Sequence, residues 1–484
     1  MFEFDLIRAE SAGEVTLRGK KIEYRTMSEE FLLYDDAGNP DATIFTISYE
    51  RKGVNTEGRP VLFAYNGGPG CASLLVHMGA LGPQRVAMGD GVNLPFETPY
   101  HMEENPDCIL DICDLVMIDP VGTGYSRILK EEAADKYYNS ETDAKAVIMT
   151  MYQWIETHHR WNCPLLILGE SYGTIRSAMV ADQIFVNKIG NTCNALNMHL
   201  DGIILLGSAL DRDKSKFLIE PSVINFSAVA ATNWYHMQDE KPSLENYLNE
   251  AEKFAYGDYL SALALGRRVA DEKYEHVLDQ LQYFTSLSKQ ILKSENLRVW
   301  AFQYPSLRMK DGKDLISVYD GRFTSAPVAA ASDYEWEDDD PCCCRIMPAF
   351  THCFHAYMKE FLGIETNRIY TGENMHLFDV WQFNASKNPV HFLESAMRKN
   401  QNLKLFFANG YYDLATTKGY VDYMINRFDL PEDRIWTQGY ESGHMCYIGE
   451  DAAKKLGQDL RKFVTWICGN DSKVAEKENL EVSK

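Results

Sequence analysis

The sequence predicts an α/β fold with a mostly parallel central sheet and helices on both faces. Two observations support this. Short apolar runs typical of buried strands recur along the chain, and residues 140–159 between two of them have the spacing of an amphipathic helix. Strand, helix and strand in that order are typical of a parallel sheet. With 484 residues, the chain is long enough for one large domain that carries an insertion.

Three apolar segments open the predicted sheet. Residues 15–24 and 43–50 have strand patterns, and residues 35–40 between them supply turn chemistry, which predicts an antiparallel start to a mixed sheet. Residues 60–65 form a buried strand that runs directly into the glycine-dense loop Asn66-Gly-Gly-Pro-Gly-Cys71. Such a loop lets the backbone approach a ligand closely and point successive amides at an oxyanion.

The next elements lead to a serine motif. Residues 115–118 form a buried strand, and the loop at 119–126 contains Gly-x-Gly without the third glycine of a dinucleotide site, so no nucleotide cofactor is expected. The helix over 140–159, with Ser140 as its cap, leads to the apolar run 165–168 and then to Gly169-Glu-Ser-Tyr-Gly173. Between a strand and a helix, Gly-x-Ser-x-Gly exposes the serine on a tight turn. Ser171 is therefore the candidate nucleophile.

A long insertion divides the second half of the chain. Residues 200–207 form another strand, after which the regular alternation of strands and helices stops until 403–410 and 434–439. An amphipathic helix is expected over 451–467. The predicted organisation is a first core segment at 1–211, a mainly helical inserted cap at 212–367, a second core segment at 368–469 and a flexible tail at 470–484.

The charge balance excludes several classes of partner. The chain has 70 acidic and 48 basic residues, a net charge of -22, which argues against binding to nucleic acid or to anionic membranes. No apolar run has the length of a membrane span, and residues 1–5 lack the features of a secretory signal. We therefore expect a cytoplasmic protein whose 11 cysteines are reduced thiols. The cluster of Cys342–Cys344, His352, Cys353 and His355 lacks paired Cys-x-x-Cys spacing, so no metal is expected.

Two late loops carry candidate partners for the serine. A serine hydroxyl needs a histidine to accept its proton and a carboxylate to orient that histidine. In hydrolases with this type of sheet, the acid and then the histidine follow the serine on loops after late strands. Asp413 and His444 meet these conditions, and we expect them to complete a catalytic triad with Ser171.

Five motifs in this order resemble those of the serine carboxypeptidase family. They are Asn66-Gly-Gly-Pro-Gly-Cys71, Asp119-Pro-Val-Gly-Thr-Gly-Tyr-Ser126, Gly169-Glu-Ser-Tyr-Gly173, Asn409-Gly-Tyr-Tyr-Asp413 and Gly443-His-Met445. The resemblance covers the chain apart from the insertion and the tail, and it implies an α/β-hydrolase fold with a helical cap. It also implies that the amides of Gly67 and Tyr172 form the oxyanion hole, and that Asn66 and Glu170 bind the free carboxylate of a peptide.

Glu170 connects this resemblance to a physical expectation. Two carboxyl groups hydrogen-bond closely only when one holds a proton, so Glu170 should bind a C-terminal carboxylate best when protonated. The predicted function is a serine carboxypeptidase with an acidic pH optimum and no cofactor. It acts through an acyl-enzyme on peptides with a free C-terminus. A homodimer is left open.

Two departures from the family pattern keep alternatives open. Many eukaryotic members have a tryptophan and a second glutamate where this chain has Ala64 and Ala80, so carboxylate recognition is expected to be reduced. An esterase or acyltransferase with the same triad is the alternative. A non-catalytic binding protein is the third hypothesis, and the intact triad argues against it. Residues 77–83 and 171–176 are closer to bacterial members of the family.

Overall fold

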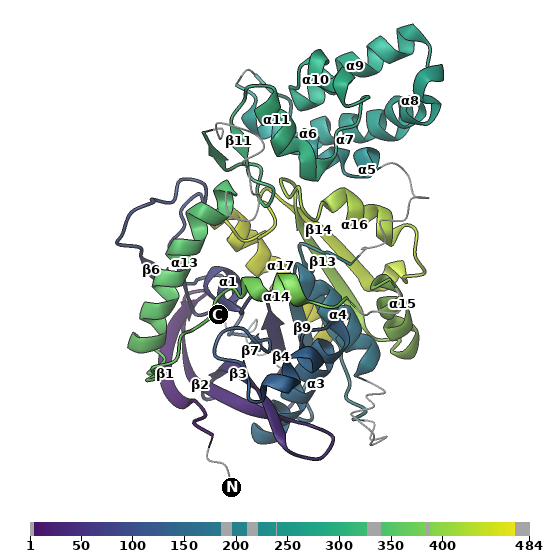
Figure 1. Cartoon of the computed structure of the whole chain (residues 1–484). Helices are drawn as coiled ribbons and strands as arrows, with labels where there is room; N and C mark the ends of the chain where they lie inside the picture. The colour runs from purple at the N-terminus through teal and green to yellow at the C-terminus, as the bar shows by residue number, and fades with distance from the viewer. Residues whose placement is uncertain are drawn as a thin grey trace, which may run out of the picture.

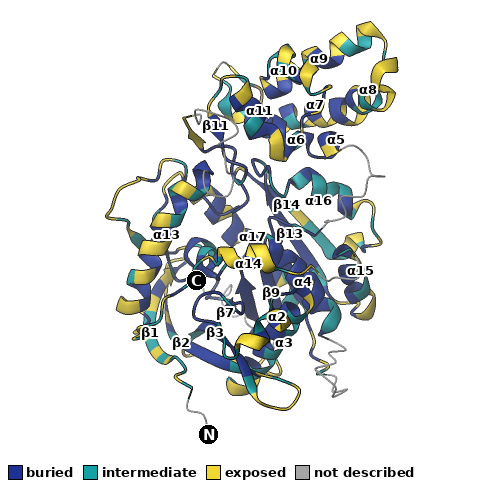
Figure 2. Ribbon diagram, viewed as in Figure 1, coloured by how far each residue is buried: buried dark blue, intermediate teal, exposed yellow. Residues whose placement is uncertain are grey.

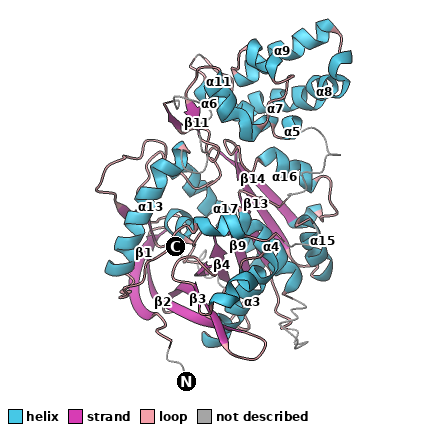
Figure 3. Cartoon of the chain, viewed as in Figure 1, coloured by secondary structure: helices cyan, strands magenta, loops and turns pink. Residues whose placement is uncertain are grey.

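The computed structural model describes residues 4–184, 196–210, 221–238, 240–326, 340–383 and 388–469. Within these ranges, the chain forms a mixed sheet in the order β1-β2-β3-β7-β4-β9-β10-β13-β14, with β8 paired to β3 (Figure 3). The strands on the main path are β1 (Arg8–Leu17), β2 (Lys20–Tyr34), β3 (Pro40–Arg51), β7 (Asp114–Asp119), β4 (Val61–Tyr65), β9 (Leu165–Glu170), β10 (Gly202–Leu206), β13 (Lys404–Gly410) and β14 (Ile435–Tyr440). The pairs from β7 to β14 are all parallel, which confirms the predicted mostly parallel sheet.

The amino-terminal hairpin differs from the prediction. The sequence predicts one strand over 15–24, but this range contains the end of β1, a turn and the start of β2. Arg18 and Gly19 have φ values of 52° and 76°, the pair of positive angles that a tight hairpin turn requires. The single-strand prediction is wrong because arginine at the first of these positions gives no turn signal. The turn predicted over 35–40 is confirmed, since β2 ends at Tyr34 and β3 begins at Pro40.

Helices cover both faces of the sheet, and the strands between them are buried (Figure 2). One face packs against α1 (Leu74–Val76), α13 (Pro341–Glu360) and α17 (Glu450–Cys468). The other packs against α3 (Ser140–Thr157), α4 (Tyr172–Gln183), α15 (Val390–Lys399) and α16 (Lys418–Ile425). Along β9, Leu166 and Leu168 join the first cluster and Leu165 and Ile167 the second, because successive side chains of a strand point to opposite faces.

The crossover helix α3 begins where the sequence predicts it, but its cap is a different residue. Asn139 is the N-cap, and its side-chain oxygen accepts a hydrogen bond from the Thr142 amide at 3.0 Å. Ser140, the predicted cap, is the first helical residue instead. Both residue types are good N-caps, so the sequence alone could not choose between neighbours.

A separate helical unit projects from one end of the molecule (Figure 1). It contains α5 (Pro221–Ile224), α6 (Phe226–His236), α7 (Leu244–Phe254), α8 (Leu260–Leu265), α9 (Asp271–Thr285), α10 (Lys289–Ser294) and α11 (Tyr304–Lys310). These helices share their own apolar cluster, which also includes Leu414, the residue after Asp413. In contrast, α13 lies inside the predicted insertion but packs on the main core. The boundary at 211/212 and the tail at 470–484 lie outside the described residues, and the domain boundaries stay a prediction.

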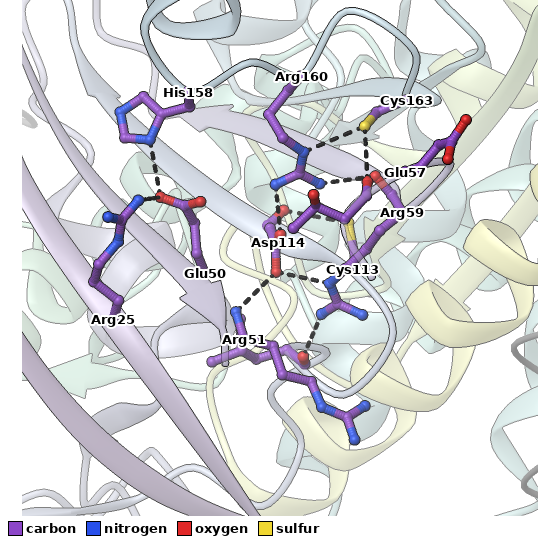
Figure 4. Close-up of polar contacts among 12 residues, drawn as sticks. Arg25, Glu50, Arg51, Glu57, Arg59, Cys113, Asp114, His158, Arg160 and Cys163 are labelled. Carbon is purple, nitrogen blue, oxygen red and sulfur yellow. Dashed lines mark hydrogen bonds and ion pairs between the residues drawn. The ribbon is translucent and has the colours of Figure 1, made fainter. Parts of the chain in front are cut away.

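Charged side chains are paired at the amino ends of the parallel strands (Figure 4). Asp114, the first residue of β7, accepts hydrogen bonds from Arg59 Nε at 2.8 Å and from Arg160 Nη1 at 2.6 Å. All three residues are buried. Arg59 and Arg160 precede β4 and β9, so the cluster connects three strand starts. Buried charges are tolerated in this arrangement because each has an opposite charge and hydrogen-bond partners.

None of the helices that the structure describes combines the length and the apolar character needed to cross a membrane.

Candidate active site

Ser171 lies on a sharp turn between β9 and α4. Its φ and ψ angles are 58° and -125°, a conformation that residues with a side chain rarely adopt. The surroundings hold it there: the Ser171 amide donates to the carbonyl of Leu206 in β10 at 2.9 Å. Gly169 and Gly173 are in such close contact that a Cβ at Gly169 would collide with the Gly173 carbonyl. The turn therefore needs glycine at position 169, and a Cβ at Gly173 would lie only 3.0 Å from the Asn66 carbonyl oxygen.

Asp413 and His444 follow the neighbouring strands β13 and β14 and contact each other directly. His444 Nδ1 lies 2.9 Å from Asp413 Oδ2. The other carboxylate oxygen, Oδ1, accepts hydrogen bonds from the amides of Ala415 and Thr416, both at 2.8 Å. The Thr416 hydroxyl donates to Asp413 Oδ2 at 2.6 Å and lies 2.8 Å from His444 Nδ1. Asp413 is completely buried, so these contacts fix its orientation toward the imidazole.

Backbone contacts bring His444 close to the serine turn. Gly207 follows the carbonyl that binds the Ser171 amide, and a Cβ at Gly207 would lie 2.8 Å from His444 Nδ1. Among the described contacts, no hydrogen bond joins the Ser171 hydroxyl to His444. Such contacts are often longer in free enzymes than in substrate complexes.

The charge environment of His444 suits a general base. Burial disfavours the imidazolium, but the charge and hydrogen bond of Asp413, together with the charge of Glu170, outweigh this effect. The net result is a pKa of His444 above its usual value. A more basic imidazole accepts a proton from a hydroxyl more readily.

The two backbone segments predicted to supply oxyanion donors lie together beside Ser171. A Cβ at Gly67 would lie 2.5 Å from the Tyr172 amide nitrogen and 2.9 Å from Ser171 Cβ, so only glycine fits there. Tyr172 is the first residue of α4, and its amide therefore has no acceptor within the helix. Amides in this position can donate to charge that develops on a substrate oxygen.

Glu170 and Asn66 form a buried polar pair next to the serine turn. Asn66 Nδ2 donates to Glu170 Oε1 at 2.7 Å, and the Val76 amide donates to Asn66 Oδ1 at 3.0 Å. Glu170 is 2% exposed, and its second oxygen, Oε2, has no hydrogen-bond partner. Burial raises the pKa of Glu170 to about 7, although His444, Tyr447 and Asn66 act in the opposite direction. Near neutral pH, this carboxyl group can therefore hold a proton.

The buried ion pair between Asp143 and Arg176 contacts the first residue of the glycine loop. Arg176 of α4 donates through Nε to Asp143 Oδ2 at 2.7 Å and through Nη1 to the carbonyl of Asn66 at 2.7 Å. The Tyr172 hydroxyl donates to the same Asp143 oxygen at 3.2 Å. This pair connects α3, α4 and the loop that begins at Asn66, and it fixes the position of Asn66 relative to the serine turn.

The structure gathers all predicted site residues at the carboxyl ends of the parallel strands. They are Asn66, Gly67, Glu170, Ser171, Tyr172, Asp413 and His444. Sequence reasoning missed the contributions of Thr416 and of the Asp143–Arg176 pair. Thr416 has a weak signal, because it lies three residues after the candidate acid. Asp143 has none, since an aspartate in the first turn of a helix looks like an ordinary exposed residue.

The expected absence of a metal stays a prediction. Within the ranges that the structure describes, no three His, Cys, Asp or Glu side chains gather as a metal site requires. On α13, Cys342 and Cys353 are buried while Cys344 is exposed. The ten cysteines of the described ranges are free thiols.

Comparison with known proteins identifies the family. A model of the serine carboxypeptidase family matches residues 31–462. The chain belongs to the serine carboxypeptidase family. The "pheromone-processing carboxypeptidase KEX1" of Ogataea parapolymorpha is 27% identical over 194 residues, which cover 39% of this chain and 26% of that protein. The protein of the same name from Pyrenophora tritici-repentis is 30% identical over 136 residues, 27% of this chain and 19% of that protein. The matches thus span about a quarter or less of these relatives.

A solved structure of a carboxypeptidase has the same fold. Kex1(delta)p, a prohormone-processing carboxypeptidase from Saccharomyces cerevisiae, aligns with a TM-score of 0.53 at 17% identity. The alignment covers 94% of this chain and 91% of that one. The predicted α/β-hydrolase fold is confirmed.

Proposed function

We propose that this serine carboxypeptidase family member removes the last residue from peptides with a free C-terminus. The observation that carries the proposal is Glu170, a buried carboxyl group bonded to Asn66, adjacent to Ser171, with a pKa raised to about 7. A protonated acid can donate a hydrogen bond to a peptide carboxylate, whereas an ionised one would repel it. Hydrolysis of an ordinary ester does not require such a group.

The remaining residues fit acyl transfer in two steps. The Ser171 hydroxyl attacks the last peptide carbonyl while His444 accepts its proton, and Asp413 stabilises the imidazolium. The amides of Gly67 and Tyr172 donate to the oxyanion of the tetrahedral intermediate. His444 then gives the proton to the leaving amino acid, and water activated by His444 hydrolyses the acyl-enzyme.

The two titrating groups set opposite limits on the pH range. Glu170 must hold its proton to bind the peptide carboxylate, so binding weakens as the pH rises through about 7. His444 must be neutral to act as a base, and its raised pKa limits the rate on the acidic side. We infer a bell-shaped profile for peptides with its maximum at mildly acidic pH.

Two small residues favour the alternative of an esterase or acyltransferase. Ala64 is completely buried in the strand before the glycine loop, and Ala80 lies in the following helical segment. Neither can hydrogen-bond a carboxylate, so recognition of a free C-terminus would depend on Asn66 and Glu170.

Three further proposals concern context. A cytoplasmic location would fit the free thiols among the described cysteines. The similarity to bacterial family members rests on residues 77–83 and 171–176 alone. The relatives named above do not support it. Peptides as partners and a homodimer stay predictions.

One comparison tests the proposed function. A blocked dipeptide and its C-terminal amide are incubated with the native protein and with Ser171→Ala. We expect the free acid to be cleaved with at least about tenfold higher kcat/KM than the amide, the effect of one charge-assisted hydrogen bond, and a loss of about 10⁵-fold in the variant. Equal cleavage of acid and amide would refute the roles of Glu170 and Asn66. Activity close to the native level in the variant would refute the triad.

A further inference from the structure

Tyr447 has a feature that packing alone does not explain. It lies three residues after His444 and is completely buried, with its hydroxyl unpaired. A Cβ at Gly79 would lie 2.4 Å from the Tyr447 ring and 3.2 Å from the ring of Phe350 in α13, so both rings pack against Gly79. The ring position is therefore fixed. A phenylalanine would fill the same volume without the cost of burying an unpaired hydroxyl.

The hydroxyl interacts with the carboxyl group of Glu170. Glu170 Oε1 is engaged by Asn66, whereas Oε2 is unpaired like the phenol. The two groups are close enough to affect each other's protonation: after burial, the charge of Glu170 is the main cause that raises the pKa of Tyr447. The phenol already acts on Glu170 as a donor that lowers its pKa, although neither Tyr447 Oη nor Glu170 Oε2 has a partner at ordinary hydrogen-bond geometry.

The distribution of donors decides where the proton of Glu170 belongs. Because Oε1 accepts from Asn66, the proton of the neutral acid sits on Oε2. Oε2 keeps one lone pair in that state, which a phenol can occupy as donor. A hydroxyl at that lone pair would restrict rotation of the carboxyl group and direct its proton away from the tyrosine.

We propose that Tyr447 is a positioning residue for recognition of the substrate carboxylate. Its hydroxyl donates to Glu170 Oε2 when a peptide binds, so that the proton of Glu170 points at the peptide's C-terminal carboxylate. This inference rests on the proposed carboxypeptidase function and assigns to Tyr447 part of the recognition that Ala80 cannot supply.

Tyr447→Phe tests the inference, with Tyr304→Phe as the matched control. The Tyr304 hydroxyl, in the helical unit, donates to the Thr285 carbonyl at 2.6 Å. For Tyr447→Phe we expect KM for a blocked dipeptide acid to rise roughly tenfold, with kcat and the kinetics of the matching amide unchanged. Its melting temperature should fall less than that of Tyr304→Phe, because the Tyr447 hydroxyl has no partner at ordinary hydrogen-bond geometry in the free protein. Tyr304→Phe should lower the melting temperature and leave KM unchanged.

The pH profile adds a readout that a merely structural role would not move. The titratable groups around Glu170 are His444, Asp413, Tyr447, Cys446 and Cys71. Tyr447→Phe removes one of these groups, a hydroxyl that favours the ionised form of Glu170. The pKa of Glu170 should therefore rise in the variant, and the alkaline limb of the 1/KM profile for the acid substrate should move to higher pH.

The outcomes separate this inference from the proposed function. If the native protein does not distinguish acid from amide, the proposed function fails. If the native protein distinguishes them and Tyr447→Phe keeps the same ratio and the same alkaline limb, only the role of Tyr447 is refuted. Equal changes for acid and amide would also refute it, as a general distortion of the site. If turnover is too slow to measure, the dissociation constant of a blocked amino acid as competitive inhibitor gives the same comparison.

Discussion

The two ends of the parallel strands differ in how completely their buried carboxyl groups are hydrogen-bonded. At the amino ends, Asp114 is shared between Arg59 and Arg160, and both carboxylate oxygens have charged donors (Figure 4). At the carboxyl ends, Glu170 has one oxygen without a partner, and Ser171 has a positive φ. Both regions are buried within one sheet. The amino-end cluster is complete without a ligand, whereas the site retains strain and unused hydrogen-bonding capacity, as expected where a substrate binds.

The largest difference should appear when each region loses its central group. Ser171→Ala should reduce kcat/KM for peptides about 10⁵-fold, because the nucleophile is lost. The free energy of unfolding should change by less than about 0.5 kcal/mol, since alanine meets the same backbone strain and the hydroxyl has no bond to His444. Peptide hydrolysis and urea denaturation measure the two effects. Ser177→Ala is the control: its hydroxyl is bonded to Tyr65 and to the Gly173 carbonyl, both at 2.9 Å, so stability should fall and activity remain.

The amino-end cluster should show the reverse pattern. Asp114→Asn removes the negative charge between two buried arginines and should lower the free energy of unfolding by about 3–5 kcal/mol. The activity of the remaining folded molecules should be unchanged. Glu141→Gln is the control, because Glu141 pairs with Lys145 on the surface and should contribute less than about 0.5 kcal/mol. A loss below about 1 kcal/mol in urea denaturation of Asp114→Asn would contradict the structural role of the cluster.

Glu170 allows the site to be tested through pH. In the native protein, KM for a peptide acid should rise about tenfold for each pH unit above about 7, as Glu170 loses its proton. In Glu170→Gln the side-chain amide can donate at every pH, so KM should vary less than about twofold over the same range.

Glu373 offers a matched control for that experiment. It lies against the same glycine loop, at a bridge with Cys71, and burial raises its pKa. Glu373→Gln should keep the native pH dependence of KM. If it abolishes the dependence while Glu170→Gln retains it, the carboxyl group responsible has been misassigned.

Sequence alone could predict those features of the site that depend on the backbone, namely the strands and the tight turn at Ser171. The strands that carry Ser171 and Asp413 are continuous apolar runs, and the glycines around Ser171 have a steric requirement that the motif displays. The hairpin turn at Arg18 escaped prediction because no turn residue marks its first position. Asp143, Thr416 and Tyr447 escaped for another reason. Thr416 lies only three residues from Asp413, but its contact with His444, like the contacts of Asp143 and Tyr447, forms only when segments distant in sequence pack together, and no periodicity encodes such contacts.

Thr416 and Thr417 allow a site contact to be compared with a structural contact at two adjacent residues. The Thr416 hydroxyl contacts Asp413 and His444, whereas the Thr417 hydroxyl donates to Asn225 at 2.5 Å and accepts from the Tyr420 amide as the N-cap of α16. Thr416→Val should lower kcat about fivefold, the effect of one modest hydrogen bond, with KM and stability nearly unchanged.

Thr417→Val should instead lower the free energy of unfolding by about 1 kcal/mol, the usual contribution of a cap, with kcat retained. Valine matches threonine in shape at both positions, so a difference between the two variants reports the hydroxyl alone. Steady-state kinetics and urea denaturation of both variants measure it. Equal effects on kcat would show that the loop between Asp413 and α16 acts as one packed unit, and that Thr416 does not orient the acid and the imidazole.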